Sequence, residues 1–396
     1  MPSSALPHTT SDAAPRTIAA TTYDPAPTTT VGQAPDPATA TARTGEPRRD
    51  LLIDLARAGA LGMVVLWHWV FTTIRFGSDG PHVGNPVGVT PGMWLATWVL
   101  QPMPIFFAVG GVLHARSLAN GTEGFRRRRM RRLLVPALPL LVPAVVLALG
   151  AAALGRGDIV ASIILIISPM WFLAVYVALV ALAPFAWRGH CAAPRATLAA
   201  MIGLAAVLDV ARFGFGVGGP LMTVACFTAV WAVVHQLGFH LDALRASGLG
   251  RRTAVAVGGI VALAVAVSVG PYPAAMVGVP GERVSNMAPP TFAVTLLAVF
   301  QLGLLAACAG PLERFAARHR DGLAWAGRWS MTVFVWHLLA WVGFYAVLRS
   351  TGTPVTGDVS GAWWLARPLW LLGPSAFAVP LCALTARFDP SNRRSA

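Results

Sequence analysis

Arg57 and His68 are the two residues of this chain whose types and spacing are best suited to chemistry. They lie eleven positions apart in the first long apolar segment. Eleven steps of about 100° on an α-helix make three turns plus about 20°, so both side chains face the same way, roughly 16 Å apart along the axis. A guanidinium binds anionic groups and a neutral imidazole accepts protons. Ionisable side chains are costly inside a membrane, so the pair predicts a functional site, with Arg57 at the helix edge and His68 near its middle.

The elements that must position this pair are membrane-spanning helices. Hydrophobic residues make up 56% of the 396 residues and charged residues 12%, against roughly 25% charged in an average soluble domain. Apolar segments of roughly 17–25 residues, the length that crosses a bilayer as a helix, recur along the chain. The sequence therefore predicts an all-α fold, a polytopic integral membrane bundle of about ten transmembrane helices. The predicted spans are 54–74, 92–114, 133–153, 168–187, 196–212, 220–239, 253–270, 289–309, 329–349 and 362–386.

The arginines give an independent check on this topology. The chain has 30 basic residues, all of them arginine. With the amino terminus inside, 23 of the 30 fall in the tails and in the connections on the inner side, as the positive-inside rule requires. We therefore expect a multi-pass protein of the cell membrane, embedded in the lipid bilayer, with both termini cytoplasmic. The arginines cluster between apolar runs and form no stripe on a soluble domain, so nucleic acid is not an expected partner.

Three regions follow from the composition. Residues 1–48 are rich in Thr, Ala and Pro and contain no long apolar run, so they predict a disordered cytoplasmic tail without a catalytic role. Residues 49–387 form the predicted ten-helix domain, and 388–396 a short cytoplasmic tail. The four cysteines are scattered, without the spacing of a metal site or a disulfide framework. No metal site is predicted.

The densest charge cluster is the run of six arginines at 126–132. One interpretation is a topology anchor that also contacts anionic lipid head groups. The other is a binding surface for a polyanionic cytoplasmic ligand, because arginine forks match phosphate oxygens bidentately. No phosphate-cradling loop of the GxxxxGK[ST] type accompanies the cluster, which argues against a nucleotide triphosphatase.

The chain resembles the membrane acyltransferase 3 family over about residues 49–386. The resemblance rests on five landmarks in the family's order: Arg57-x10-His68 in the first predicted helix, Phe106-Phe107-x-x-Gly110-Gly111 in the second, Arg129-x-x-Arg132 entering the third, Trp171-Phe172-Leu173 in the fourth and Ser330-x-x-x-Phe334-x-x-His337-Leu338 in the ninth.

Two details depart from the family's pattern or leave it open. Many members have Ser where Gly110 stands, so a hydroxyl at that point is not required here. The arginine register is also ambiguous, because Arg128 and Arg131 have the same spacing as Arg129 and Arg132.

The resemblance implies an enzyme that transfers an acyl group from an acyl-CoA donor to a hydroxyl, commonly on a carbohydrate or small-molecule acceptor of the cell envelope or for secretion. His68 is the implied catalytic base, although an imidazole could also take the acyl group itself. Arg57 is its implied catalytic partner near the donor, with Asp54 one turn away as an ion-pair partner. The implied substrate-binding residues are Arg128, Arg129, Arg132, Trp171 and His337.

Each candidate also has a structural interpretation. His68 could make an interhelical hydrogen bond, and Arg57 could extend to the membrane interface. His337 could support His68 or bind the acceptor, while His114 and His235 are expected at the interface. The rival function is a transporter or lipid-translocating protein whose buried His and Arg line a pathway; the absence of an internal repeat argues against it. A different acyltransferase superfamily acting on lipids or proteins is a third hypothesis. Loss of a labelled acyl group from acyl-CoA to an acceptor separates enzyme from transporter.

Overall fold

The computed structural model describes most of the predicted helical domain and little of either predicted tail. The tail 1–48 and residues 389–396 lie outside the described residues. Within the described part, the secondary structure is helical apart from one antiparallel hairpin, β1 (Thr73–Gly77) with β2 (Gly80–Gly84), and an isolated bridge. The described residues are 49–77, 80–353, 355 and 358–388.

Ten membrane spans are present among the described residues when one bent pair is counted as a span, which confirms the predicted bundle. The bent pair is α12 (Phe292–Ala307) and α13 (Ala309–Arg318), with 66° between them. Nine further segments are long and apolar enough to cross a membrane by themselves. They are α1 (Leu51–Val70), α2 (Met93–Leu100) with α3 (Met103–Ala119), α4 (Phe125–Leu134) with α5 (Leu138–Ala153), α7 (Met170–Ala192), α8 (Pro194–Asp209) with η4 (Val210–Gly214), α9 (Pro220–Phe239), α11 (Leu249–Val269), α14 (Arg320–Ser350) and α16 (Arg367–Thr385).

Short elements connect these spans. The turn η3 joins α4 to α5, and α6 is too short to cross a bilayer as a helix. The connecting elements are η2 (Pro86–Gly88), η3 (Val135–Ala137), α6 (Gly157–Ile167), α10 (Leu241–Ala246), α15 (Gly361–Leu365) and η5 (Ala386–Phe388).

Helix α1, which carries the Arg57–His68 pair, is shorter at its far end than the sequence predicted. It begins after Asp50, whose carboxylate accepts a hydrogen bond from the Ile53 amide at 3.2 Å and so caps the helix. It ends at Val70, not at residue 74, because the chain turns into β1. His68 therefore lies in the last turn of the helix, and the prediction that it lies near the middle is wrong.

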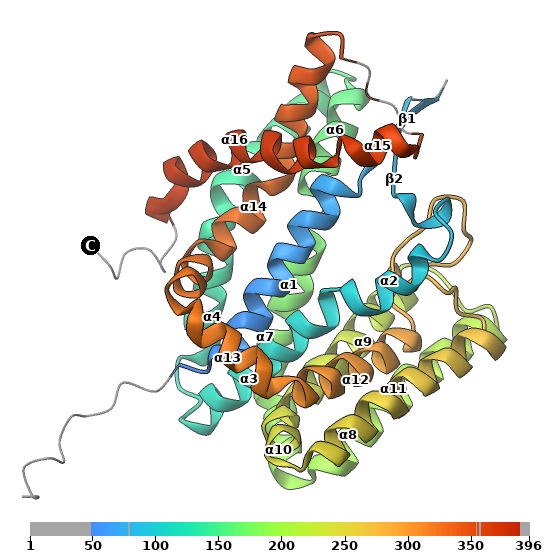
Figure 1. The fold of residues 1–396 in the computed structure, drawn as a ribbon, viewed down its shortest axis with the longest axis vertical. Coiled ribbons are helices and arrows are strands. Elements are labelled where there is room, and N and C mark those ends of the chain that lie inside the picture. The colour runs from blue at the N-terminus through green and yellow to red at the C-terminus, as the bar shows by residue number, and fades with distance from the viewer. Residues whose placement is uncertain (1–48, 78–79, 354, 356–357, 389–396) are drawn as a thin grey trace, which may run out of the picture. The chain divides into compact units, whose positions relative to one another are not determined.

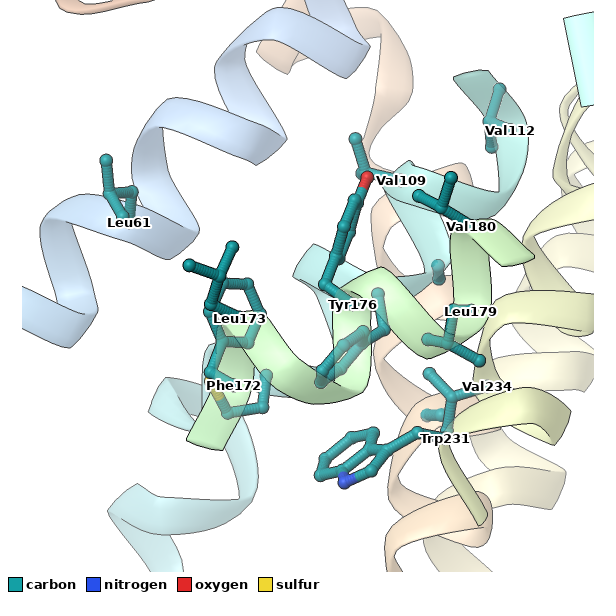
Figure 2. Packing of buried hydrophobic residues seen from close by; sticks show 14 of the residues in the cluster. Leu61, Val109, Val112, Phe172, Leu173, Tyr176, Leu179, Val180, Trp231 and Val234 are labelled. Carbon is teal, nitrogen blue, oxygen red and sulfur yellow. The ribbon is translucent and has the colours of Figure 1, made fainter. Parts of the chain in front are cut away.

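The neighbours of α1 come from distant parts of the chain (Figure 1). It packs against α14 on one side and α3 on another, while α14 packs on α16 and α3 on α9. Helices α8, α9, α11 and α12 form a group that lies away from α14 and α16 in Figure 1. Aromatic residues of α3, α7 and α9, among them Phe107, Phe172 and Trp231, fill the core where these helices meet. Figure 2 shows Phe172 and Trp231 in this core.

Two glycines let α3 and α9 touch backbone to backbone. A Cβ on Gly111 would collide with the carbonyl oxygen of His235, and a Cβ on Gly238 would collide with that of Ala108. Small residues at such a contact are the usual way for membrane helices to approach closely. The contact brings His114, one turn beyond Gly111, against His235.

The bundle has two chemically different ends. The end that holds Asp50, the last turn of α3 and the six arginines at 126–132 is called the arginine-rich end. The opposite end, where α1 runs into the β-hairpin, is called the hairpin end. There the Asn85 amide donates to the Gly278 carbonyl at 2.7 Å, so the segment after the hairpin is bound to the 270–291 loop.

An ion cluster fastens the start of α1 at the arginine-rich end. Asp50 accepts hydrogen bonds from Arg116 of α3 at 2.7 Å and from Arg245 of α10 at 2.6 Å. Arg116 also contacts Asp242, and Arg245 contacts Glu313. Burial raises the pKa of Asp50, but the hydrogen bonds from the two arginines outweigh burial and leave that pKa below its ordinary value.

Candidate functional site

His68 of α1 and His337 of α14 form a pair at the hairpin end. The distance from His337 Nε2 to His68 Nδ1 is 3.3 Å, and the ring centroids lie 4.9 Å apart. The neighbouring Trp69 indole donates to the His337 carbonyl at 2.8 Å, and the Thr72 hydroxyl donates to the His68 carbonyl at 2.6 Å. These two bonds fix the register of α1 against α14 and the end of α1.

The hydrogen-bond partners assign the proton positions of the pair. His337 Nδ1 lies 2.6 Å from the Phe334 carbonyl oxygen and His68 Nδ1 lies 2.8 Å from the Val64 carbonyl oxygen. A carbonyl only accepts, so both Nδ1 atoms carry the proton when the rings are neutral. His337 Nε2 is then an acceptor that shares the His68 Nδ1–H with Val64. Among the four ring nitrogens of the two histidines, His68 Nε2 is the one whose lone pair has no hydrogen-bond donor among the described residues.

A cavity of about 320 Å³ lies beside His68. This volume is at the lower end of the range found for small-molecule sites, roughly 300–1,000 Å³. Its walls come from α1, the α2–α3 connection, the start of α7 and the loops of the hairpin end. They are mostly apolar and aromatic, with the amides Asn85 and Gln101 and the hydroxyl of Thr72 as polar groups. The lining residues are Leu61, Val64, Trp67, His68, Phe71, Thr72, Val83, Gly84, Asn85, Gln101, Pro102, Met103, Phe106, Pro169, Trp171, Phe172, Val277, Gly278, Met287 and Phe334.

The predicted site residues divide between this cavity and the other end of the bundle. His68 and Trp171 line the cavity. His337 lies behind His68 and is 1% exposed. The four arginines, Arg57, Arg128, Arg129 and Arg132, are absent from the cavity wall and belong to the half of the bundle with the arginine-rich end.

Arg57 makes the ion pair that the spacing predicted. Its guanidinium donates to Asp54 at 3.3 Å, at the i,i+3 distance along α1. Its Nε is buried and has no hydrogen-bond partner among the described residues. A Cβ on Gly327 would lie 3.2 Å from Arg57 Nη2, so the glycine leaves the guanidinium room.

Arg129 is the arginine of α4 that turns inward. Its guanidinium donates to the Leu113 carbonyl of α3 at 3.3 Å and is half-buried, whereas Arg128, Arg131 and Arg132 are exposed. The side chains of Arg129 and Arg57 are both partly buried. The sequence left two registers open, Arg128 with Arg131 and Arg129 with Arg132. Only the second register has an arginine that turns into the bundle, namely Arg129.

Tyr176 explains the glycine that departs from the family's pattern. A Cβ on Gly110 would lie 2.6 Å from the Tyr176 hydroxyl oxygen, so a serine there would displace the tyrosine. Figure 2 shows the Tyr176 side chain reaching from α7 to α3 beside Val109. Sequence reasoning passed over Tyr176, although the small residue at 110 was a signal that a large side chain fills this point.

A second histidine pair was also missed. His114 Nδ1 lies 2.9 Å from His235 Nε2, and the two residues are 0% and 2% exposed. Both side chains are almost entirely buried between α3 and α9. Each histidine is three residues from a glycine of the α3–α9 contact, and this shared offset was the available signal.

A family model described as an acyltransferase domain matches residues 50–387 of the chain. No curated protein and no solved structure matches it. The matched range includes both histidine pairs, the cavity, Arg57 and the three arginines predicted to bind substrate.

Proposed function

The chain belongs to the acyltransferase 3 family and is a multi-pass membrane acyltransferase. From this premise we propose that it transfers an acyl group from acyl-CoA to a hydroxyl group. The acceptor that we propose is a carbohydrate or other small molecule for the cell envelope or for secretion. The observation that supports this most is the free Nε2 of His68 beside a cavity of about 320 Å³.

His68 acts as the general base in this proposal. Its Nε2 takes the proton of the acceptor hydroxyl while the hydroxyl oxygen attacks the thioester carbonyl. The new C–O bond forms, the C–S bond breaks, and the proton passes from Nε2 to the leaving CoA sulfur, so the imidazole ends neutral. A positioned base of this kind typically contributes 10²–10⁴-fold in rate.

His337 positions that base. Its Nε2 lone pair and the Val64 carbonyl both attract the His68 Nδ1–H, which supports the tautomer with the lone pair on Nε2. His337 also stabilises the positive charge that His68 carries while it holds the proton, because an acceptor beside Nδ1–H favours the imidazolium.

The arginines form the donor side. CoA carries several phosphate charges, and guanidinium groups bind phosphates bidentately. Arg57 and Arg129 are partly buried at this end of the bundle, and the exposed Arg128 and Arg132 extend the cationic surface. The thioester arm of the donor would run along α1 from Arg57 to His68, roughly 16 Å at 1.5 Å per residue.

The cavity forms the acceptor side. Trp171 and Phe71 offer aromatic faces, which suit the apolar face of a ligand. The Asn85 and Gln101 amides already donate to the Gly278 and Met276 carbonyls, so each has one N–H and one oxygen lone pair left for a ligand hydroxyl. With 23 of the 30 arginines on one side, the arginine-rich end is the cytoplasmic one and both termini lie in the cytoplasm. Donor and acceptor then approach His68 from opposite sides of the cell membrane.

The test is acyl-CoA binding and turnover by the purified full-length protein in detergent. We expect micromolar acetyl-CoA binding that Arg57→Ala or the double variant Arg129→Ala/Arg132→Ala weakens at least tenfold, while Arg318→Ala, an exposed arginine of α13, binds as wild type does. Release of CoA thiol that depends on an added hydroxyl acceptor supports the enzyme. Binding without turnover for any acceptor, together with passage of label across vesicles, would favour a transporter instead.

A further inference from the structure

An apolar furrow runs along the outer wall of α7, α8 and α9, away from the His68 cavity. It consists of two neighbouring pockets of about 220 and 280 Å³ that both have Met201 and Ala232 in their walls. The first pocket is bounded by Phe185 and His235, and the second extends to Leu208 and Ala225. All other lining side chains are apolar except Thr228.

The furrow has the direction and length of a lipid chain. It follows α9 from His235 to Ala225, and these ten residues correspond to about 15 Å of helix. Half of a hydrocarbon core about 30 Å thick is the same length. Its walls are open at the surface, since Leu182 and Phe185 are exposed. In a helix bundle that spans a bilayer, such an exposed apolar furrow faces acyl chains.

Two arginines meet at the mouth of the furrow that lies toward the arginine-rich end. The guanidinium carbon of Arg126 on α4 lies 5.1 Å from the centroid of the Phe185 ring, and that of Arg188 on α7 lies 4.8 Å from the same centroid. Both side chains are exposed. Among the described residues, neither guanidinium is within ion-pair distance of a carboxylate.

We propose that the furrow and this arginine pair form a binding site for one anionic phospholipid. The phosphate is held between Arg126 and Arg188, and one acyl chain lies along the furrow past Ala232. The charge of the pair selects the ligand: neither guanidinium has a carboxylate partner among the described residues, and both can donate bidentate hydrogen bonds to a phosphate. The site does not depend on the acyl-transfer proposal.

The test compares phosphatidylglycerol with phosphatidylcholine of the same acyl chains, each titrated into the full-length protein in detergent and read by native mass spectrometry. Wild type is expected to bind phosphatidylglycerol about tenfold more tightly. Arg126→Gln/Arg188→Gln removes that preference, whereas the matched control Arg314→Gln/Arg318→Gln, two exposed arginines of α13, retains it.

A second variant tests the furrow itself. Ala232→Leu enlarges a side chain that lies in the walls of both pockets and is expected to weaken phosphatidylglycerol binding several-fold with both arginines intact. Equal binding of the two lipids to wild type would overturn the proposal. So would an unchanged preference in the Arg126→Gln/Arg188→Gln variant, since the arginines would then not hold the phosphate.

Discussion

The two histidine pairs of this protein have similar contacts and different access to solvent and substrate. Ring nitrogens meet across two helices in both, at 3.3 Å for His68 with His337 and at 2.9 Å for His114 with His235. His68 lines a cavity of about 320 Å³. His114 is fully enclosed, and its Nε2 has no hydrogen-bond partner in the described part of the chain.

The difference decides which of the two pairs can meet a substrate, as the proposed function requires. A lone pair beside a space large enough for a substrate can accept a proton from that substrate, which is the situation of His68 Nε2. A lone pair enclosed in a core has no such partner, and an unpaired buried polar atom costs about 1–3 kcal/mol. The His114–His235 bond therefore serves the packing of α3 on α9, where Gly111 and Gly238 bring the helices together.

Replacing His68 should cause the largest loss of activity and so distinguish the two histidine pairs. His68→Ala should lower kcat by 10²–10⁴-fold, because the base is lost. Its stability should fall by about as much as that of His114→Ala, since the buried His337 Nε2 loses its partner. Turnover of acyl-CoA by purified variants and thermal unfolding in detergent measure the two quantities.

His114→Ala is the matched control for that variant, because it also breaks a buried histidine pair but leaves the cavity beside His68 unchanged. The activity per folded molecule stays within a few-fold of wild type. The stability falls by about 1–3 kcal/mol, because the bond to His235 is lost. A fall in kcat for His114→Ala as large as that for His68→Ala would break the distinction between the pairs.

Replacing His337 tests whether this residue positions His68 or binds the acceptor. His337→Ala removes the acceptor beside His68 Nδ1–H, while Val64 keeps its bond. We expect kcat to fall about tenfold, or about 1.4 kcal/mol in the barrier, with KM unchanged, and His337→Gln to recover part of the loss through its amide oxygen. A change in KM alone would instead indicate that His337 binds the acceptor.

Alanine substitutions at two helix glycines, Gly110 and Gly59, should change the free energy of unfolding in opposite directions. Gly110→Ala places a Cβ 2.6 Å from the Tyr176 hydroxyl, and overpacking of this kind typically costs about 1–3 kcal/mol. Gly59→Ala on α1 meets nothing within 4 Å, so it should stabilise by up to about 1 kcal/mol through helix propensity. Denaturation in detergent measures both. Equal stability of the two variants would contradict the close contact of α3 with Tyr176.

The smallest expected effect concerns acid stability at the arginine-rich end. Because the pKa of Asp50 is lowered in the folded protein, the stabilisation from its carboxylate is complete above the unfolded pKa of about 4 and is lost as the pH falls through the folded value. Asp50→Asn should therefore be less stable than wild type at pH 7, with the difference shrinking below about pH 4. A constant difference across that range would contradict the ion cluster.

The sequence was sufficient for the fold class because its signals were local. Apolar runs of spanning length and arginines between them determine ten helices without knowledge of any tertiary contact, and all ten predicted spans have a counterpart among the described residues. The Arg57–Asp54 pair was predictable for the same reason, since i,i+3 neighbours of a helix are set by its geometry.

The site was only partly predictable because it depends on contacts between distant segments. His68 and His337 are 269 positions apart, and periodicity alone does not bring α1 to α14. The end of α1 at Val70 depends on the hairpin that follows and on its attachment through Asn85 to Gly278. The inward turn of Arg129 depends on the Leu113 carbonyl of α3, a partner that the spacing of the arginines does not reveal.

The most direct test of His68 as the general base is chemical modification of the wild-type protein with diethyl pyrocarbonate. This reagent carbethoxylates accessible neutral imidazoles. Labelling of each histidine is followed by peptide mass spectrometry while acyl transfer is assayed. We expect that activity is lost at the rate at which His68 is labelled, that acyl-CoA with acceptor slows both, and that His114 stays unlabelled. Full activity with His68 completely labelled, or inactivation that follows the labelling of His114, would contradict this role of His68.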